Sequence, residues 1–571
     1  MVDKEKMENS AEQVAKRPVS EKDEVKETEN STSKAKGAKS NAKWVILGGV
    51  AGVALVATAV GLNLNLEKTG SEKILGSITP DNGDSKINWE RYAAYDYNLS
   101  ETGSLTISAS GTYHLTGTLT DGAVTINAST SEVKLILDNV SIKNSNGPAI
   151  YCIEAEDLVI ETVGENYLED GTKYATNYDE DASGAIYSKA DLAFQGTGTL
   201  NVTANYQDGI VGKDDVKFNS GSYVISAADD GIRGKDSVYV VDGKFTISAK
   251  GDGVKSTNET DTGKGFVLIE KGTFDITAGA KGIKAINSIL IYDGSLNVTS
   301  TDDSIHSNNY LGIMGGEIAV SSGDDGMHAD RELIIDAGTV KVLKSYEGLE
   351  AQAITINGGD ISVIANDDGL NAGGGADSSA TGRPGANTFD ADASCVLAIN
   401  GGNLYVNSAG DGIDSNGYLY FNGGTVVVDG PTNNGNGALD AGVSIQQSGG
   451  TVIAAGASGM AETLGATSSV NNASIYFSSS LSAGTKVEIK NAAGATIISY
   501  TSAKAFNHMA VGTPEFKTGE TYTVYVNGTE YTSFTVSGIV TTAGNLNQNF
   551  NNAMQGGQSG NTRAGMQGGM R

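Results

Sequence analysis

The chain has few of the residues that build disulfide frameworks, zinc sites or nucleic-acid surfaces. Its 571 residues include two cysteines and four histidines, and no Cys/His set has metal-ligand spacing. Cys152 and Cys395 lie far apart, each in an apolar run, so we expect buried thiols rather than a disulfide. The net charge of −29 argues against a nucleic-acid partner, which needs a basic surface, and favours cation binding or an acidic soluble surface.

Aromatic residues are also few, at 6% of the chain, whereas glycine is abundant, with 76 residues. A phrase of Asp, Gly and an aliphatic residue recurs between Asp208 and Asp411. Its steps are 21 or 22 residues, or about one such period plus an insertion. A second glycine recurs in step with it, from Gly221 to Gly424. Two columns in step identify a solenoid repeat.

Each repeat contains short alternating apolar segments between Gly, Asn and Asp, a pattern typical of strands and not of helices. Three strands and three turns in about 22 residues predict one coil of a parallel β-helix, so the fold class is all-β. Two apolar columns should face inward and stack on neighbouring coils about 4.8 Å apart. They are Ile210, Ile232, Val254, Ile283, Ile305, Met327, Leu349, Leu370 and Ile413, and Ile225, Ile247, Ile276, Val298, Val320, Val342, Val363, Val406 and Val428.

The ends of the chain lack the repeat. We expect a disordered cytoplasmic tail at 1–43, a membrane segment at 44–64 and a linker at 65–88. The β-helix should cover 89–470, a small antiparallel β cap 471–540, and a disordered tail 541–571. Trp44 to Leu62 carries no charge over 19 residues and follows four lysines, which predicts a transmembrane helix with the bulk of the chain outside the cell. A cleavable signal peptide is the alternative, and either way the protein should be exported to the cell surface.

Acidic residues form the main candidate site. The Asp of the phrase is preceded by a second Asp in four coils, and equivalent residues should lie about one strand spacing apart. Adjacent carboxylates repel unless a cation lies between them, and oxygen ligands suit Ca²⁺. The alternative is that Asp-Gly is simply good turn chemistry, in which Asp bonds its own backbone. We expect calcium at Asp229, Asp230, Asp252, Asp302, Asp303, Asp324, Asp325, Asp367, Asp368 and Asp411.

A polar column follows directly after the first inward column and should face outward. Its basic members suit an acidic polysaccharide, although a mixed-sign stripe is more often only a solvated surface. The two histidines of the column could bind metal together, but neutral surface histidines are the simpler expectation. The candidate glycan contacts are Arg233, Lys255, Lys284, His306 and His328, with Tyr310 for stacking on a sugar ring.

Four coils and two flanking phrases resemble a known family. The coils are Asp229–Ile232, Asp302–Ile305, Asp324–Met327 and Asp367–Leu370, and the phrases are Gly111–Gly117 and Gly519–Val524. Over roughly residues 90–540 the chain resembles exported bacterial carbohydrate-binding proteins that form a right-handed parallel β-helix, bind calcium, and attach to cellulose and pectic polygalacturonate. The resemblance implies a right-handed solenoid, bound Ca²⁺ and a plant cell-wall polysaccharide as ligand.

Three functions are compatible with these features. The favoured one is a non-catalytic, monomeric, carbohydrate-binding protein at the cell surface. A calcium-dependent pectate-type lyase is the first alternative, but it needs a base beside the uronate, and no dense acid and base cluster accompanies Arg233, Arg331 or Arg383. A structural adhesin, in which the repeats serve only the fold, is the second alternative.

Overall fold

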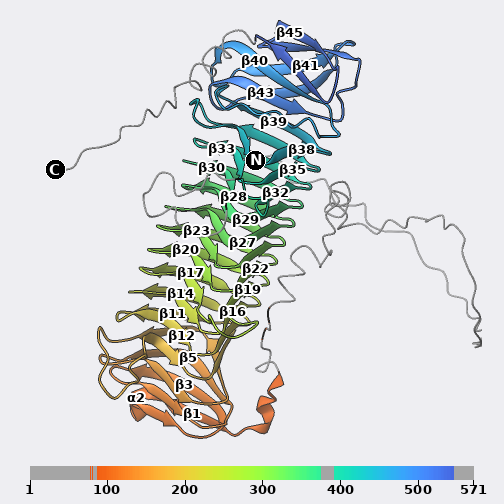
Figure 1. Cartoon of the computed structure of the whole chain (residues 1–571). Helices are drawn as coiled ribbons and strands as arrows, with labels where there is room; N and C mark the ends of the chain where they lie inside the picture. The colour runs from red at the N-terminus through yellow and green to blue at the C-terminus, as the bar shows by residue number, and fades with distance from the viewer. Residues whose placement is uncertain (1–77, 79, 81–85, 374–390, 546–571) are drawn as a thin grey trace, which may run out of the picture. The chain divides into compact units, whose positions relative to one another are not determined.

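The computed structural model describes residues 78, 80, 86–373 and 391–545. In this part of the chain nearly all regular structure is β, apart from a 3₁₀ turn (Trp89–Arg91) and one short helix, α2 (Leu99–Thr102). The strands stack coil upon coil from β1 to β39 (Figure 1). They form three parallel columns, here called sheets 1, 2 and 3, that join at the bends and, with β40, β43 and β46 beyond the last coil, make one network of 42 strands. The solenoid is of the right-handed type.

Sheet 1 begins at the Asp-Gly phrase of each repeat. Its strands are β2 (Leu105–Ile107), β4 (Val124–Asn127), β6 (Ile150–Glu154), β9 (Gly184–Ser188), β12 (Asp208–Gly212), β15 (Ile232–Gly234), β18 (Val254–Ser256), β21 (Ile283–Ala285), β24 (Ile305–Ser307), β27 (Met327–Ile335), β29 (Leu349–Ile356), β31 (Leu370–Ala372), β34 (Ile413–Ser415) and β37 (Leu439–Ala441).

Sheet 2 follows sheet 1 along the chain, and β27 and β29 continue from sheet 1 into it. Its other strands are β1 (Ala94–Asn98), β3 (Gly111–Leu119), β5 (Val133–Lys143), β7 (Asp157–Val163), β10 (Asp191–Gly196), β13 (Asp215–Phe218), β16 (Ser237–Val240), β19 (Phe266–Ile269), β22 (Ser288–Ile291), β25 (Tyr310–Ile313), β32 (Val396–Ile399), β35 (Tyr418–Phe421) and β38 (Ser444–Gln447).

Sheet 3 completes each coil, and β3 and β5 run on into it from sheet 2. Its other strands are β8 (Glu165–Glu169), β11 (Thr199–Ala204), β14 (Ser222–Ala227), β17 (Lys244–Ala249), β20 (Thr273–Ala278), β23 (Ser295–Ser300), β26 (Glu317–Ser321), β28 (Thr339–Lys344), β30 (Asp360–Ala365), β33 (Asn403–Ser408), β36 (Thr425–Asp429) and β39 (Thr451–Gly456).

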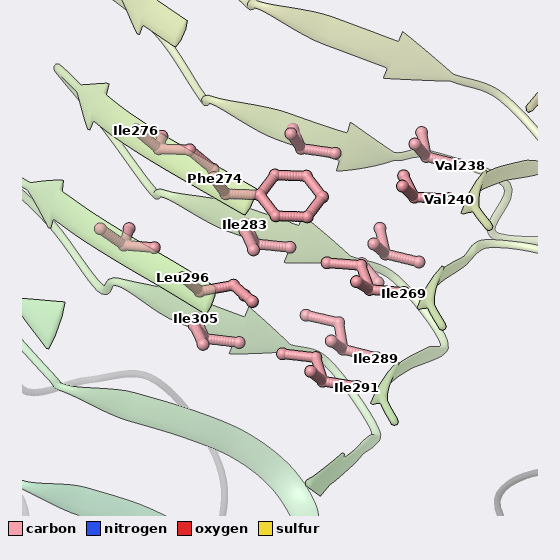
Figure 2. Close-up of a cluster of buried hydrophobic side chains, with 14 of the residues drawn as sticks. Val238, Val240, Ile269, Phe274, Ile276, Ile283, Ile289, Ile291, Leu296 and Ile305 are labelled. Atoms are coloured by element: carbon pink, nitrogen blue, oxygen red, sulfur yellow. The ribbon is translucent and has the colours of Figure 1, made fainter. Parts of the chain in front are cut away.

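The coils stack in register, which confirms the predicted parallel solenoid. In sheet 1, Ile210 pairs with Ile232, and Ile232 with Val254, so the step is 22 residues. All members of the two predicted inward columns are at most 2% exposed. Figure 2 shows Ile283 and Ile305 of one column directed toward the side chains of sheets 2 and 3. A coil can bury this apolar face only against its neighbours, so stacking is what stabilises the fold.

The repeated glycine of the Asp-Gly phrase is required by lack of space. A Cβ added to Gly231 would lie 2.5 Å from the carbonyl oxygen of Gly253 in the next coil and 2.5 Å from Cγ2 of Ile247. The second glycine column has a different cause, because its members have positive φ angles, as at Gly316 with φ of 88°. The two columns recognised in the sequence therefore mark two different backbone constraints.

After β39 the parallel pattern ends. Strand β43 (Phe506–Gly512) pairs antiparallel with both β39 and β40 (Asn472–Leu481). Strand β46 (Val540–Gly544) pairs with β40. A separate antiparallel sheet has the strand order β42 (Thr496–Thr501), β41 (Lys486–Asn491), β44 (Thr521–Val526) and β45 (Thr529–Thr535). These strands cover the open edge that the last coil would otherwise present.

The expected cytoplasmic tail, the membrane segment at 44–64 and almost all of the linker lie outside the described residues. The disordered tail expected from residue 541 begins too early, because Val540–Gly544 forms β46, and only residues from 546 on lie outside the described part. Within the described ranges, no helix has the length and apolar character needed to cross a membrane. The membrane segment therefore stays a prediction from the sequence.

Candidate functional site

The acidic residues of the Asp-Gly phrase form a continuous row at the start of sheet 1. We call this row the Asp ladder, and its members are Asp208, Asp230, Asp252, Lys281, Asp303, Asp325, Glu347, Asp368 and Asp411. In several coils, one carboxylate oxygen of the ladder residue accepts a hydrogen bond from the backbone N–H of the ladder residue in the next coil. The backbone N–H of Asp230 donates to Oδ1 of Asp208 (3.1 Å), and that of Asp252 to Oδ1 of Asp230 (2.9 Å). These carboxylates bond the following coil rather than their own turn.

The residues after the inward column form a second row beside the ladder. This outer column comprises Val211, Arg233, Lys255, Lys284, His306, His328, Glu350, Asn371, Asp414 and Asp440, which pair in register. Its basic members at the N-terminal end are bound to the ladder. Arg233 Nη2 lies 2.8 Å from Oδ2 of Asp208, and Lys255 Nζ lies 2.5 Å from Oδ2 of Asp230.

Lys281 takes an acidic position of the ladder and contributes a cation there. Its Nζ lies 2.5 Å from Oδ2 of Asp303 and 3.0 Å from Oδ1 of Asp302. Of the expected calcium residues, Asp230, Asp252, Asp302 and Asp303 therefore already have a lysine of the protein itself as partner. Arg233 and Lys255 have buried acidic partners, which removes most of their capacity to bind a glycan carboxylate.

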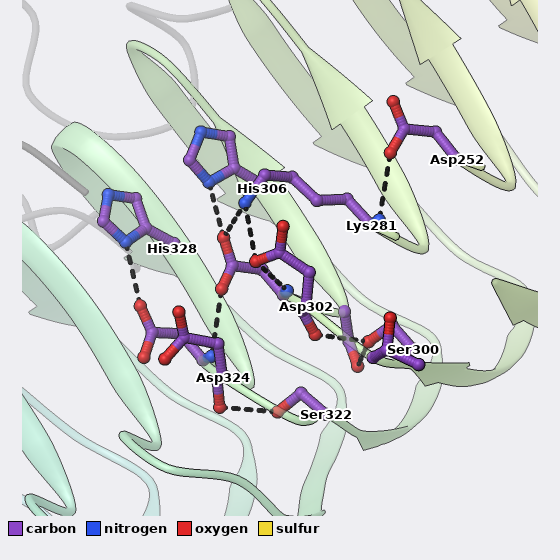
Figure 3. A network of polar contacts seen from close by, with 12 residues as sticks. Asp252, Lys281, Ser300, Asp302, His306, Ser322, Asp324 and His328 are labelled. Atoms are coloured by element: carbon purple, nitrogen blue, oxygen red, sulfur yellow. Dashed lines mark hydrogen bonds and ion pairs between the residues drawn. The ribbon is translucent and has the colours of Figure 1, made fainter. Parts of the chain in front are cut away.

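The two histidines are buried, at 3% and 0% exposure, and not on the solvated surface that the alternation predicted (Figure 3). Their rings stack with centroids 4.7 Å apart. Nδ1 of His306 lies 2.8 Å from Oδ2 of Asp303. Nδ1 of His328 lies 3.0 Å from both Oδ2 of Asp325 and Oε2 of Glu350. Burial alone would lower the pKa of His328, but its hydrogen bonds to carboxylates raise that pKa far above the usual value.

The structure brings some of the remaining predicted residues together, since carboxylate oxygens of Asp208, Asp229 and Asp230 lie within 4.8 Å of one another, as do those of Asp302, Asp303 and Asp324. Asp229 is exposed, whereas Asp324 is buried and Asp367 half-buried. Tyr310 lies on sheet 2, with the Arg331 guanidinium carbon 5.9 Å from its ring centroid, so it does not join the outer column. Among the described residues, no salt bridge involves Lys284, the one predicted basic contact that the ladder does not hold.

The C-terminal half of the two rows contains acids without basic partners. This acid stripe comprises Glu347, Asp368, Asp411, Asp414 and Asp440 of the two rows, together with the neighbouring Glu462, and among the described residues none of its members forms a salt bridge. Burial, followed by repulsion from Glu347 and other neighbouring acids, raises the pKa of Asp368 to about 9. Burial and then repulsion from Glu350 raise the pKa of Glu347 to about 8. Burial and then repulsion from Asp411 and Asp440 raise the pKa of Asp414 to about 8 as well.

Asn371 lies within the acid stripe and has an unused acceptor. Its Nδ2 donates to Oε2 of Glu347 (2.9 Å), while its Oδ1 has no hydrogen-bond partner although the residue is only 1% exposed. Carboxylate and amide oxygens that converge without a basic residue are the donor set that Ca²⁺ takes. The residues present therefore fit calcium at Glu347, Asn371, Asp368, Asp411 and Asp414, and fit it poorly near Lys255 and Lys281.

The sequence analysis missed the roles of several residues. Lys281 and Glu347 were visible only as degenerate copies of the phrase, and Glu350, Asn371 and Asp414 only as members of a polar column. The sequence does contain one indication of these roles, because the outer column has no basic residue after His328. This change becomes informative only when the outer column and the Asp ladder are known to be in contact.

Sheet 3 carries two hollows on its surface. One, of about 300 Å³, is lined by Thr339, Lys341, Asp360, Ile361, Ser362, Asn403, Leu404, Tyr405, Thr425 and Val427. The other, of about 280 Å³, lies among residues of β3, β5, β8 and β11, beside Tyr167.

Comparison with known proteins agrees with the resemblance seen in the sequence. Residues 101–369 match the model of the family described as carbohydrate-binding domain-containing proteins. A protein of the same description from Acetivibrio thermocellus is 40% identical over 190 residues, which are 32% of this chain and 66% of the relative. The chain thus spans just under two thirds of that carbohydrate-binding relative.

A solved structure also resembles the chain. It is that of a polysaccharide lyase-like protein from C. thermocellum, prepared as a gadolinium derivative. It shares 27% sequence identity and a TM-score of 0.38, and the match covers 39% of this chain and 98% of the other.

Proposed function

We propose that the protein is a non-catalytic cell-surface protein that binds an acidic plant-type polysaccharide through calcium held at the acid stripe. The carbohydrate-binding family supports a glycan ligand. The observation that carries the proposal is the run of neighbouring carboxylates around Asp368 and Asp414, whose pKa values are raised to about 9 and about 8, first by burial and then by repulsion from the acids beside them.

Calcium accounts for two properties of the stripe together. It would neutralise carboxylates that otherwise have to hold protons near neutral pH. It would also bridge to the carboxylates of a polyuronate, which a protein of charge −29 would otherwise repel. Asn371, Asp414 and Asp440 occupy successive coils in register, so any contact made there recurs at the coil spacing. Repeated weak contacts along a polymer add up as multivalent binding.

Two observations favour binding over cleavage. Arg233 is held by Asp208 and by Ser183, so it is not available as a base beside a bound sugar. The guanidinium of Arg331 lies over the Tyr310 ring. A lyase would need an unengaged base next to the calcium-bound uronate.

The test is co-sedimentation of the purified protein with insoluble polygalacturonate and with cellulose, with calcium or with chelator. Calcium-dependent sedimentation with polygalacturonate is expected, and it should be lost in the double variant Asp368→Asn/Asp414→Asn. The control Asp275→Asn changes an exposed acid on sheet 3 and should sediment like the unmodified protein. Release of unsaturated products would identify a lyase, and no sedimentation with either polymer would favour the adhesin.

Surface display is the second part of the proposal. The apolar segment 44–64 would keep the protein in the membrane with the solenoid outside. Protease added to intact cells should then remove the solenoid. If the solenoid is protected until the cells are lysed, or is found entirely in the medium, a membrane-anchored exterior location is wrong.

A further inference from the structure

We propose that Asp325, His328 and Glu350 form a second metal site that binds a divalent transition-metal ion such as Zn²⁺, separate from the calcium proposed for the acid stripe. The donor atoms already converge. Nδ1 of His328 lies 3.0 Å from Oδ2 of Asp325 and 3.0 Å from Oε2 of Glu350. Two ligand atoms about 2.1 Å from one ion are about 3.0 Å apart at right angles and about 3.4 Å apart in the tetrahedral arrangement of Zn²⁺, so the side chains would move apart only slightly to admit the ion. The side chains are 0%, 0% and 11% exposed, so the ion would be shielded from water.

The imidazole is oriented as a metal ligand would be. Nε2 of His328 lies 3.2 Å from Oδ1 of Asp330, so it can donate its proton outward to that carboxylate. With Nε2 protonated, the lone pair of Nδ1 faces the two inner carboxylates. A ligating histidine in proteins commonly donates its other ring N–H to a carboxylate, which fixes its tautomer and increases its basicity. Asp330 is therefore the positioning residue of the proposed site.

An unused oxygen in the site points to a missing ligand. Oδ1 of Asp325 is buried and has no hydrogen-bond partner. One coil earlier, Oδ1 of Asp303 accepts the backbone N–H of Asp325 at 2.9 Å. A buried carboxylate oxygen without a donor is costly unless a cation or a proton satisfies it.

The preceding coil has a cation of its own beside the equivalent pair of Asp and His. There the pair Asp303 and His306 is completed by the ammonium of Lys281, 2.5 Å from Oδ2 of Asp303. At the next coil the corresponding ladder residue is Asp303 itself, and the residue beside His328 in the following coil is Glu350, so among the described residues no lysine pairs with Asp325. The two coils share an Asp and a His, but only the first of them also has the ammonium group of a lysine.

The donor set selects the kind of ion. One imidazole nitrogen and two carboxylates suit Zn²⁺, Mn²⁺, Co²⁺ or Ni²⁺. Calcium prefers oxygen ligands only, which the acid stripe offers and this cluster does not. The two carboxylates also balance the charge of a divalent ion when the histidine is neutral.

The experiment is calorimetric titration of the full, chelator-stripped protein with Zn²⁺ and, separately, with Ca²⁺. His328→Gln should abolish zinc binding and leave calcium binding intact. The matched control, His306→Gln, changes the neighbouring coil and should retain zinc. Asp330→Asn should weaken zinc binding by about 10- to 100-fold, as changes to outer partners of metal ligands do.

Glu350→Gln provides a second ligand variant if His328→Gln fails to fold, and it should lose zinc in the same way. Anomalous scattering from a crystal grown with zinc should place the ion between the three side chains. The proposal is wrong if zinc does not bind the unmodified protein, or if it binds both histidine variants equally, in which case protons alone satisfy the cluster. If the unmodified protein binds zinc but not calcium, only the calcium proposal for the acid stripe is contradicted.

Discussion

Asp368 provides a test in which calcium changes the sign of a mutation's effect. Burial first, and then the nearby acids Glu347, Asp411 and Asp414, raise its pKa from 3.8 to about 9. A group whose pKa is raised in the folded state gives stability that is present below the unfolded pKa and is lost as the pH rises through the folded pKa. Calcium-free protein should therefore lose stability steadily between about pH 4 and about pH 9.

The magnitude follows from the size of the shift. At roughly 1.4 kcal/mol per pKa unit, holding the proton on Asp368 at pH 7 costs at most about 4 kcal/mol. Because this side chain is partly accessible to solvent, we expect about 2 kcal/mol. Asp368→Asn removes the ionisable group and keeps an oxygen that can accept the N–H of Asp411, which lies 2.6 Å from Oδ1.

The assay is thermal unfolding of both proteins at acid, neutral and alkaline pH, in chelator and in calcium. In chelator, Asp368→Asn should melt at a higher temperature than the unmodified protein at pH 7, and the difference should vanish near pH 4, where Asp368 is protonated in both states. In calcium the order should reverse, because the variant has lost a ligand. Equal destabilisation by Asp368→Asn at every pH, with or without calcium, would refute the reasoning.

Three further predictions concern the solenoid and its charges. Lys281→Met leaves Asp303 buried without its ammonium, so it should lower the free energy of unfolding by about 3–5 kcal/mol, and Asp303→Asn added to it should restore part of the loss in chemical denaturation. Gly231→Ala should cost about 1–3 kcal/mol in the same assay, because its Cβ would meet the Gly253 carbonyl, whereas Gly538→Ala, with open space around it, should be neutral. Excess chelator should lower the melting temperature of the unmodified protein, and calcium should restore it better than magnesium; an unchanged melting curve would count against bound calcium.

The repeat made the fold predictable, because period and burial are local properties of the sequence. Ile232 and Ile247 face inward, as the alternation of apolar and polar residues along their strands predicts, and an aliphatic residue recurs at each of these positions one coil later. The space constraint at Gly231 was not predictable, since it arises from the backbone of the following coil.

The candidate site was only partly predictable. The sequence identified both charged rows, but it assigned the acids to calcium and the bases to a glycan. Their contact depends on how far a side chain reaches across the bend between the ladder and sheet 1, as Lys255 does toward Asp230. His306 and His328 alternate outward and are still buried, because they stack on each other and bond the ladder acids. The alternation of residues along a strand predicts which way a side chain points, but its burial depends on the neighbouring residues on that side.

The central claim is that the acid stripe binds calcium and, through it, an acidic polysaccharide. Its most direct test is calorimetric titration of the intact protein with soluble polygalacturonate fragments, in calcium and in chelator, beside the Asp368→Asn/Asp414→Asn variant. Binding that needs calcium and is lost in the variant is the predicted result. Binding of equal strength in chelator, or in the variant with calcium present, would contradict it.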